Sequence, residues 1–277
     1  MGVDIYKRIH EKFLWSQLGP YKWFGNFVLF PIQGWMRTHH ILNMHKPYDE
    51  ILKFKNKHFN EKCYVIATGP SLTEEDLKLI EDKTSFAVNT IFTVFNNTKW
   101  RPTYYVLVDA GYQRKLCEQH NLDFEKFARG NCFLNSENRN ISYGSKNVFL
   151  NINYLDHVYN FGISKRFKYT GDLLYGFYDN YSVTQDSMIL AIYMGFKEIY
   201  LLGADNDYLG DKQHFDGTTI EADSVYDRAI KIQNANDMAY EFVNDVAKQH
   251  GVKIYNVTRG GKVKAFERMT LEESLRK

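Results

Sequence analysis

The chain has 277 residues, of which 44% are hydrophobic and 25% are charged, enough to form one large globular domain with or without an appendage. Three cysteines in no paired pattern, and in no pattern with histidine, predict neither a disulfide framework nor a zinc site. The net charge of +2 gives no reason to expect nucleic-acid binding. We recognise no signal peptide and no membrane-spanning run, and therefore expect a cytoplasmic protein.

Residues 1–60 are predicted to form an irregular helical appendage to a main domain at 61–277. Residues 1–62 carry ten Lys/Arg against five Asp/Glu, and residues 13–35 of this stretch include eight large aromatic residues: Phe13, Trp15, Tyr21, Trp23, Phe24, Phe27, Phe30 and Trp35. Rings and cations together suit peripheral contact with the inner face of a membrane. The alternative is that the rings pack on the main domain or on a sister subunit of a homo-oligomer. Gly19-Pro20, Gly25, Pro31 and Gly34 are expected to break any long amphipathic helix.

From residue 63 onward, short apolar runs alternate with helical patterns. The predicted strands are 63–67, 85–89, 104–109, 131–134, 147–152, 198–203 and 253–257. The predicted helices are 73–80, 112–119, 183–194 and 226–249, the last with Ile230, Met238, Phe242 and Val246 on one face. This alternation predicts a Rossmann-like α/β fold, with a mostly parallel sheet and helices on both faces.

Polar residues follow several of these strands. The first strand ends in the turn Thr68-Gly69-Pro70-Ser71, the second in Asn89, the third in Asp109, and the strand at 198–203 is followed by Asp205. The carboxyl ends of parallel strands form the edge where nucleotides bind in open α/β sheets. We therefore expect one ligand site at this edge. The alternative for the glycine and proline is ordinary turn punctuation.

The first turn of the helix after this loop is acidic, with Glu74, Glu75 and Asp76. Carboxylates there suit the helix dipole but would repel a phosphate. We therefore expect the phosphate of a ligand nearer Ser182, Thr184 and Tyr208. The first two of these could equally serve as the N-cap of the following helix.

His214 lies in a polar loop at 210–217, beyond the strand that leads to Asp205. An imidazole on such a loop can take a proton from an acceptor hydroxyl, and a solvated loop histidine is the alternative. Asp205-Asn206-Asp207 matches the Asp-x-Asp pattern that holds a divalent metal in many nucleotide-sugar enzymes. Because short matches of this kind are common, we predict no metal ligand and no resident cofactor.

Ala67-Thr68-Gly69-Pro70-Ser71-Leu72, the following Phe86-Ala87-Val88-Asn89 and the stretch from Met194 to Asp205 resemble the bacterial sialyltransferases of glycosyltransferase family 42. They also resemble the related motility-associated-factor and MptE-like proteins. The resemblance covers about residues 63–258. It implies a Rossmann-like enzyme that binds a CMP-activated sugar.

Residue by residue, the resemblance implies Gly69, Pro70, Ser71 and Asn89 at the nucleotide, Tyr208 at its phosphate and His214 as general base. The family's Arg-x-Thr-Ser-Gly run appears here as Asn180-Tyr181-Ser182-Val183-Thr184, without the basic residue. The insertion that precedes the family's histidine is nearly absent.

The function expected is therefore transfer of a sugar, such as a nonulosonic acid, from a CMP-activated donor to a surface-glycan acceptor, with Asp109 as the next candidate base. A second hypothesis is an MptE-like diphosphokinase that uses ATP and Mg²⁺ held by Asp109, Asp205 and Asp207. A third is a non-catalytic scaffold of glycan assembly.

Overall fold

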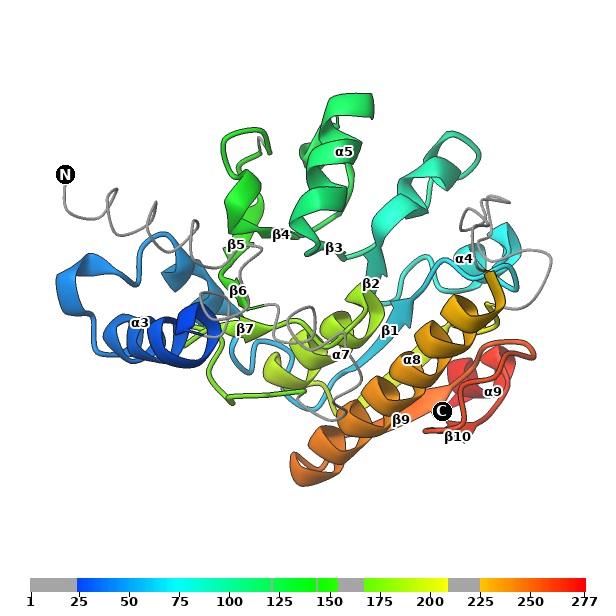
Figure 1. Ribbon diagram of the computed structural model, residues 1–277. Helices are drawn as coiled ribbons and strands as arrows, with labels where there is room; N and C mark the ends of the chain where they lie inside the picture. Colours follow the sequence, from blue (N-terminus) through cyan, green and yellow to red (C-terminus); the bar gives the residue numbers. More distant parts are fainter. Residues whose placement is uncertain (1–23, 121, 143, 154–166, 209–224) are drawn as a thin grey trace.

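The computed structural model describes residues 24–120, 122–142, 144–153, 167–208 and 225–277 (Figure 1). It has the predicted α/β fold, built on one large parallel sheet. The strands of that sheet are β1 (Lys62–Ile66), β2 (Ser85–Val88), β3 (Tyr104–Leu107), β4 (Cys132–Asn135), β5 (Asn147–Leu150), β8 (Glu198–Leu202), β9 (Lys253–Asn256) and β10 (Glu267–Arg268). Two short strands, β6 (Ile152–Asn153) and β7 (Phe177–Tyr178), pair in a separate parallel sheet.

The order of the large sheet is β10-β9-β8-β1-β2-β3-β4-β5, and every neighbouring pair is parallel. From β1 the chain builds outward to β5 and then returns to β8 on the other side of β1, in register through Ile66 and Leu202. The strand order therefore reverses between β1 and β8. In open α/β sheets, the carboxyl ends of strands at such a reversal form a crevice for a ligand.

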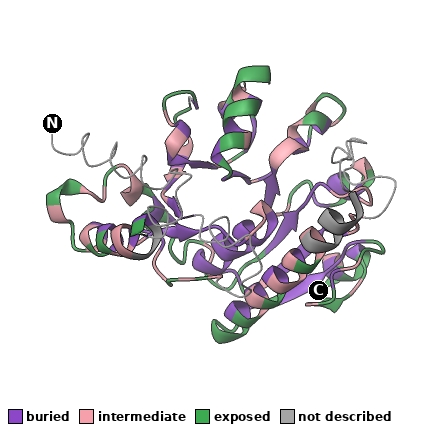
Figure 2. Cartoon of the chain, in the orientation of Figure 1, coloured by how far each residue is buried: buried purple, intermediate pink, exposed green. Residues whose placement is uncertain are grey.

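Helices cover both faces of the sheet. One face packs on α7 (Val183–Tyr193) and α8 (Val225–Gln249), and the other on α4 (Glu74–Leu79), α5 (Ala110–His120) and α9 (Leu271–Arg276). Successive strand residues point to opposite faces, so that Val65 belongs to the first core and Ile66 to the second. Figure 2 shows the central strands of the sheet largely buried between these layers, whereas both residues of the edge strand β10 are exposed. Three 3-10 helices follow strands or loops of the main domain: η4 (Asn89–Asn96), η5 (Phe124–Lys126) and η6 (Ser136–Asn138).

α7 is buried on almost every side, since ten of its eleven residues are inaccessible. It lies between the sheet and α8, which explains why its sequence lacks a polar face. In α8 the predicted apolar stripe is rotated slightly. Ala239, Tyr240 and Val243 are buried, whereas Met238 and Phe242 are only half-buried.

The N-terminal part of the described chain contains a π-helical turn, η1 (Gly25–Leu29), followed directly by α3 (Phe30–Thr38), η2 (Ile41–Asn43) and η3 (Tyr48–Phe54). Pro31 does not break α3, because it occupies the first turn, where its missing N–H costs nothing. Gly34 does not break it either. A Cβ at this position would lie 2.7 Å from the Tyr175 carbonyl oxygen, so glycine allows α3 to pack closely on the main domain. The expectation of helix breaks at these two positions was wrong.

The predicted strands and the four predicted helices are all present, each within two residues of its expected ends. β6, β7, β10 and α9 were not predicted. Among the residues that the structure describes, no helix is both long and apolar enough to cross a membrane.

Candidate functional site

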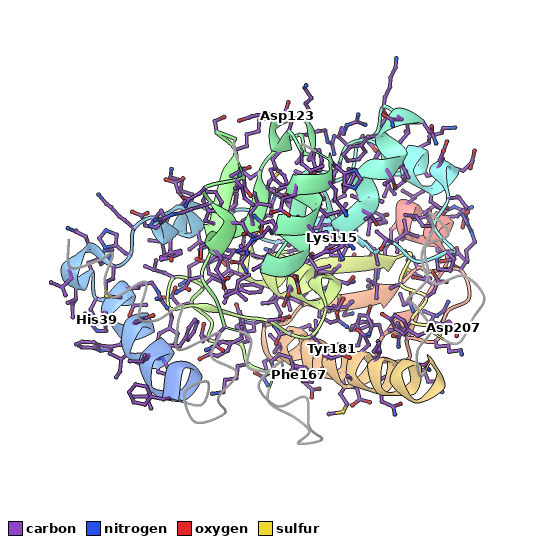
Figure 3. All side chains as sticks on the ribbon, turned by 45° about the horizontal axis from the view of Figure 1, so that its top comes forward. His39, Lys115, Asp123, Phe167, Tyr181 and Asp207 are labelled. Atoms are coloured by element: carbon purple, nitrogen blue, oxygen red, sulfur yellow. The ribbon has the colours of Figure 1, made fainter. Side chains whose placement is uncertain are left out.

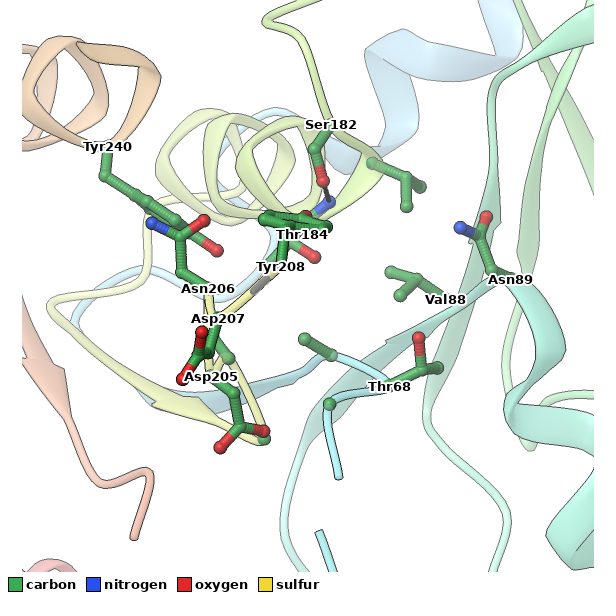
Figure 4. Close-up of a pocket in the computed structure, with 15 residues that line it drawn as sticks. Thr68, Val88, Asn89, Ser182, Thr184, Asp205, Asn206, Asp207, Tyr208 and Tyr240 are labelled. Atoms are coloured by element: carbon green, nitrogen blue, oxygen red, sulfur yellow. Dashed lines mark hydrogen bonds between the residues drawn. The ribbon is translucent and has the colours of Figure 1, made fainter. Parts of the chain in front are cut away.

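A pocket of about 150 Å³ opens where the carboxyl ends of β1, β2 and β8 meet the first turn of α7 (Figure 4). It therefore lies at the reversal of strand order. Its lining residues are Ala67, Thr68, Gly69, Val88, Asn89, Ser182, Val183, Thr184, Gly203, Ala204, Asp205, Asn206, Asp207, Tyr208 and Tyr240.

The turn after β1 is fixed by the strand end of β8. The N–H of Gly69 donates to the Gly203 carbonyl oxygen at 2.8 Å. Asp205 Oδ2 accepts from both the N–H and the Oγ of Ser71, at 3.1 and 2.9 Å. A Cβ on Gly69 would lie 2.1 Å from the same carboxylate oxygen, so only glycine fits this approach. The turn after β1 and the residues after β8 are thus hydrogen-bonded to each other, and these contacts set the distance between the two strand ends.

The first turn of α7 forms the opposite wall of the pocket. Ser182 is the N-cap, and its Oγ accepts from the N–H of Thr184 at 3.3 Å. A helix N-terminus carries a partial positive charge and favours an anion. α4 offers no such place, because its first turn holds three acidic residues and Asp76 forms a capping box with Thr73 and an ion pair with Arg259. The positive helix end at this pocket is therefore that of α7.

The loop that leads into α7 is held by two buried carboxyl groups. The N–H of Asn180 donates to Asp186 Oδ1 at 2.9 Å, and the N–H of Tyr181 donates to Asp179 Oδ1 at 3.0 Å. Burial, and then the proximity of Asp179, raise the pKa of Asp186 well above its ordinary value. Burial and the proximity of the two carboxyl groups therefore disfavour a full negative charge on Asp186, while both groups accept backbone N–H bonds that fix the loop.

α8 positions the remaining wall. Asn236 Nδ2 donates to the Tyr208 hydroxyl at 3.0 Å, and Asn236 is itself held by Gln185 Nε2 of α7, also at 3.0 Å. The neighbouring Asp237 accepts from Asn206 Nδ2 at 2.7 Å. Burial raises the pKa of Tyr208, which keeps its hydroxyl protonated. These contacts hold the segment after β8 against the helical layer.

The pocket has two carboxylates and, among the described residues that line it, no lysine, arginine or histidine. Both carboxylates have donors within the protein, since Asp205 is bonded to Ser71 and Asp207 pairs with Lys262 Nζ at 2.8 Å. The part of the chain that the structure describes contains no cluster of three or more His, Cys, Asp or Glu that could hold a metal ion. The available groups are mainly hydroxyls and amides, which suit a ligand that carries many hydrogen-bonding groups and little charge.

The structure brings together most of the predicted binding residues. Those that line the pocket are Thr68, Gly69, Asn89, Ser182, Thr184, Asp205 and Tyr208. Pro70 and Ser71 do not line it. Asp109 does not line it either, because it is exposed at the start of α5, where Oδ1 accepts from the N–H of Tyr112 at 2.6 Å. His214 lies outside the described residues, so its role stays a prediction.

Sequence reasoning missed Tyr240, which lines the pocket, and the two α8 residues that position other lining groups, Asn236 and Asp237. The spacing of these residues in the sequence could have identified them. The three positions fall within little more than one helical turn and form a polar patch beside the apolar residues of a long helix.

Comparisons with known proteins agree with this fold. A family model described as "6-hydroxymethylpterin diphosphokinase MptE-like" matches residues 37–211, more than half of the chain. A solved structure, that of the MAf glycosyltransferase from Magnetospirillum magneticum AMB-1, is similar with a TM-score of 0.50 and 15% identity, over 84% of this chain and 40% of that one. The chain therefore spans less than half the length of that enzyme.

A second solved structure is the sialyltransferase CstII from Campylobacter jejuni, in complex with the substrate analogue cytidine-5'-monophosphate. It is 16% identical, with a TM-score of 0.42 over 76% of this chain and 87% of that one. No curated protein matches the sequence. At 15% identity, the likeness to the MAf glycosyltransferase shows the fold alone.

Proposed function

The chain belongs to the MptE-like family, and from this premise and the geometry of the pocket we propose that it is a glycosyltransferase that uses a CMP-activated sugar. The donor class proposed is a nonulosonic acid, and the acceptor a hydroxyl of a surface glycan. The observation that carries the proposal is the first turn of α7, which lines the pocket opposite the strand ends of β1 and β2.

This arrangement suits a nucleoside monophosphate. A single phosphate group at the N-terminus of α7 would meet the helix dipole and the hydroxyls of Ser182, Thr184 and Tyr208. The nucleoside would then lie against Gly69 and Asn89 at the ends of β1 and β2. A triphosphate needs more positive charge than these groups supply, because neither Asp205 nor Asp207 favours it without a metal.

The proposed reaction is an in-line displacement at the anomeric carbon. The acceptor oxygen forms a bond to that carbon, the bond to the phosphate oxygen breaks, and CMP leaves with the electron pair. His214, which lies outside the described residues, is proposed to take the proton of the acceptor hydroxyl. The helix dipole and the hydroxyl groups would stabilise the charge on the departing phosphate.

The diphosphokinase hypothesis is supported by the description of the family model and by the Asp205-Asn206-Asp207 sequence. Asp205 and Asp207 would hold Mg²⁺, which when bound would neutralise the phosphates of ATP. Two carboxylates are enough for Mg²⁺ when substrate phosphates complete its ligands. However, Lys262 would first have to release Asp207, which makes this the second candidate.

Thermal unfolding with CMP, CDP, UDP and ATP, each with and without Mg²⁺, tests the proposal. A ligand at about a hundred times its Kd stabilises a protein by about 2.7 kcal/mol, which corresponds to a rise in Tm of roughly 5–10 °C for a domain of this size. We expect this rise with CMP and without Mg²⁺. The Asn89→Ala variant should lose most of it, and Asn97→Ala, which changes an exposed asparagine outside the pocket, should keep it. A rise with ATP and Mg²⁺ but not with CMP would replace the proposal with the kinase hypothesis.

A further inference from the structure

α3 and the π-helical turn before it have an unusual outer surface. The only charged side chain between Phe24 and Thr38 is Arg37, and it is buried. Ile32 and Trp35, three residues apart and so on one face of the helix, are 45% and 52% exposed. An ordinary surface helix turns charged residues to solvent, whereas this one is apolar on its outer face as well.

The inner face holds α3 firmly on the main domain. The Arg37 guanidinium donates to the Leu174 carbonyl oxygen at 3.1 Å and also to the Tyr175 carbonyl oxygen. Burial lowers the pKa of Arg37 to about 10, which leaves it charged at neutral pH. Phe30 packs against Tyr178 with ring centroids 5.3 Å apart. The outer face is therefore presented by a fixed helix.

We name as the α3 patch the four large apolar residues exposed on and beside this helix: Phe24, Ile32, Trp35 and Leu42. With exposures of 41–71% and about 150–250 Å² per large side chain, they expose roughly 300–500 Å². The largest apolar patch on a monomer is typically of this size and often has a function. A standard protein interface, however, needs about 800 Å² from each partner.

Two partners could cover the α3 patch, a second copy of this chain or an anionic membrane, and charge distinguishes them. Residues 24–62 carry six Lys/Arg against three Asp/Glu, and Lys46, Lys55 and Lys57 are exposed. A second copy of the chain would bring the same positively charged segment. An anionic lipid surface is complementary to it and also accepts tryptophan at the level of its headgroups.

We propose that the α3 patch is a membrane-contact surface, which inserts its apolar side chains at the boundary of the headgroups and acyl chains of an anionic bilayer. The surface is distinct from the pocket. In Figure 3, His39 at the end of α3 and Asp207 beside the pocket lie on opposite sides of the molecule. The proposal is thus independent of the reaction proposed above.

The test is flotation of the full chain with phosphatidylcholine vesicles, with and without phosphatidylglycerol. We expect binding only to the anionic vesicles, and weaker binding as the salt concentration rises. The double variant Ile32→Ser and Trp35→Ser should lower the partition coefficient at least about tenfold, because it removes the two central apolar contacts. Leu79→Ser, which changes a 46% exposed leucine on α4 at the other end of the molecule, is the matched control and should bind like the wild type (Figure 1).

Circular dichroism and the Tm of each variant show whether it is folded, and since both positions are exposed we expect wild-type values. Wild-type protein that does not float with anionic vesicles would overturn the proposal. So would a folded double variant that floats as well as the wild type. A wild-type dimer mass that the double variant loses, without any vesicle binding, would show that a second copy covers the patch.

Discussion

The close contact between Gly69 and the end of β8 can be tested by a substitution that adds one methyl group. In Gly69→Ala, the new Cβ would lie 2.1 Å from Asp205 Oδ2 and 2.4 Å from the Gly203 carbonyl oxygen. The second of these is a backbone atom on a buried strand end, so rotation of a side chain cannot relieve both contacts. To reach an ordinary separation, the β1 turn and the β8 end must move apart by about 1 Å.

The loss of stability that this movement causes can be estimated from two contributions, overpacking and a lost hydrogen bond. Overpacking of a well-packed site costs about 1–3 kcal/mol. The hydrogen bond from Gly69 N to Gly203 O, now 2.8 Å, would be stretched beyond bonding distance, at a further cost of about 1 kcal/mol. We expect a loss of about 2–4 kcal/mol in the free energy of unfolding, or roughly 5–15 °C in Tm.

Urea unfolding followed by circular dichroism measures this loss. Gly111→Ala is the control, because its Cβ would only touch Asp109 Oδ1 at 3.4 Å and alanine suits the start of α5. The control should be unchanged or up to about 1 kcal/mol more stable. A Gly69→Ala protein within about 0.5 kcal/mol of the wild type would refute the reasoning, since the turn would then be free to move.

Two further predictions concern α7. Thr184→Val removes a pocket hydroxyl and keeps the size of the side chain. It should weaken CMP binding in calorimetry by about 10–100-fold, the value of a hydrogen bond to a charged group. Thr93→Val, at an exposed position of η4, is the control and should bind CMP like the wild type. Asp186→Asn tests the buried carboxyl: because the folded pKa is raised, the contribution of Asp186 to stability is complete below its unfolded pKa and is lost as pH rises toward the folded value. The free energy of unfolding of Asp186→Asn relative to the wild type should therefore increase as the pH rises above about 4, the ordinary pKa of an aspartate, by at most about 1.4 kcal/mol per pH unit. A difference independent of pH would contradict this.

The main strands and helices were predictable because each carries its own local signal. Buried parallel strands are short apolar runs, and the helices between them have capping residues and periodic apolar positions. β6, β7 and β10 have two residues each, too few for any period to appear. The helix break expected at Gly34 was wrong for another reason. Glycine is needed there because Tyr175 approaches α3 closely, and Tyr175 is far away in the sequence.

The location of the site was predictable from strand ends alone, since parallel strands bring their carboxyl ends to one edge. What could not be predicted is which groups face the ligand and which hold the structure. Ser71 and Asp205 both follow strands, yet they bond to each other. Asn236 reaches Tyr208 from a helix 28 positions later, and no local pattern encodes that contact.

The hydrogen bonds between the Gly69–Ser71 turn and Asp205 change how mutations at these residues must be interpreted. Gly69 lacks a side chain because Asp205 occupies that space, and the orientation of Asp205 in turn depends on Ser71. Loss of activity after a change at Ser71 or Asp205 would therefore follow from movement of the turn as readily as from loss of a ligand contact. Thr184 and Asn89 line the pocket without taking part in this contact, so their substitutions report on the ligand itself. Evidence for the chemistry of the pocket should therefore come first from these two residues.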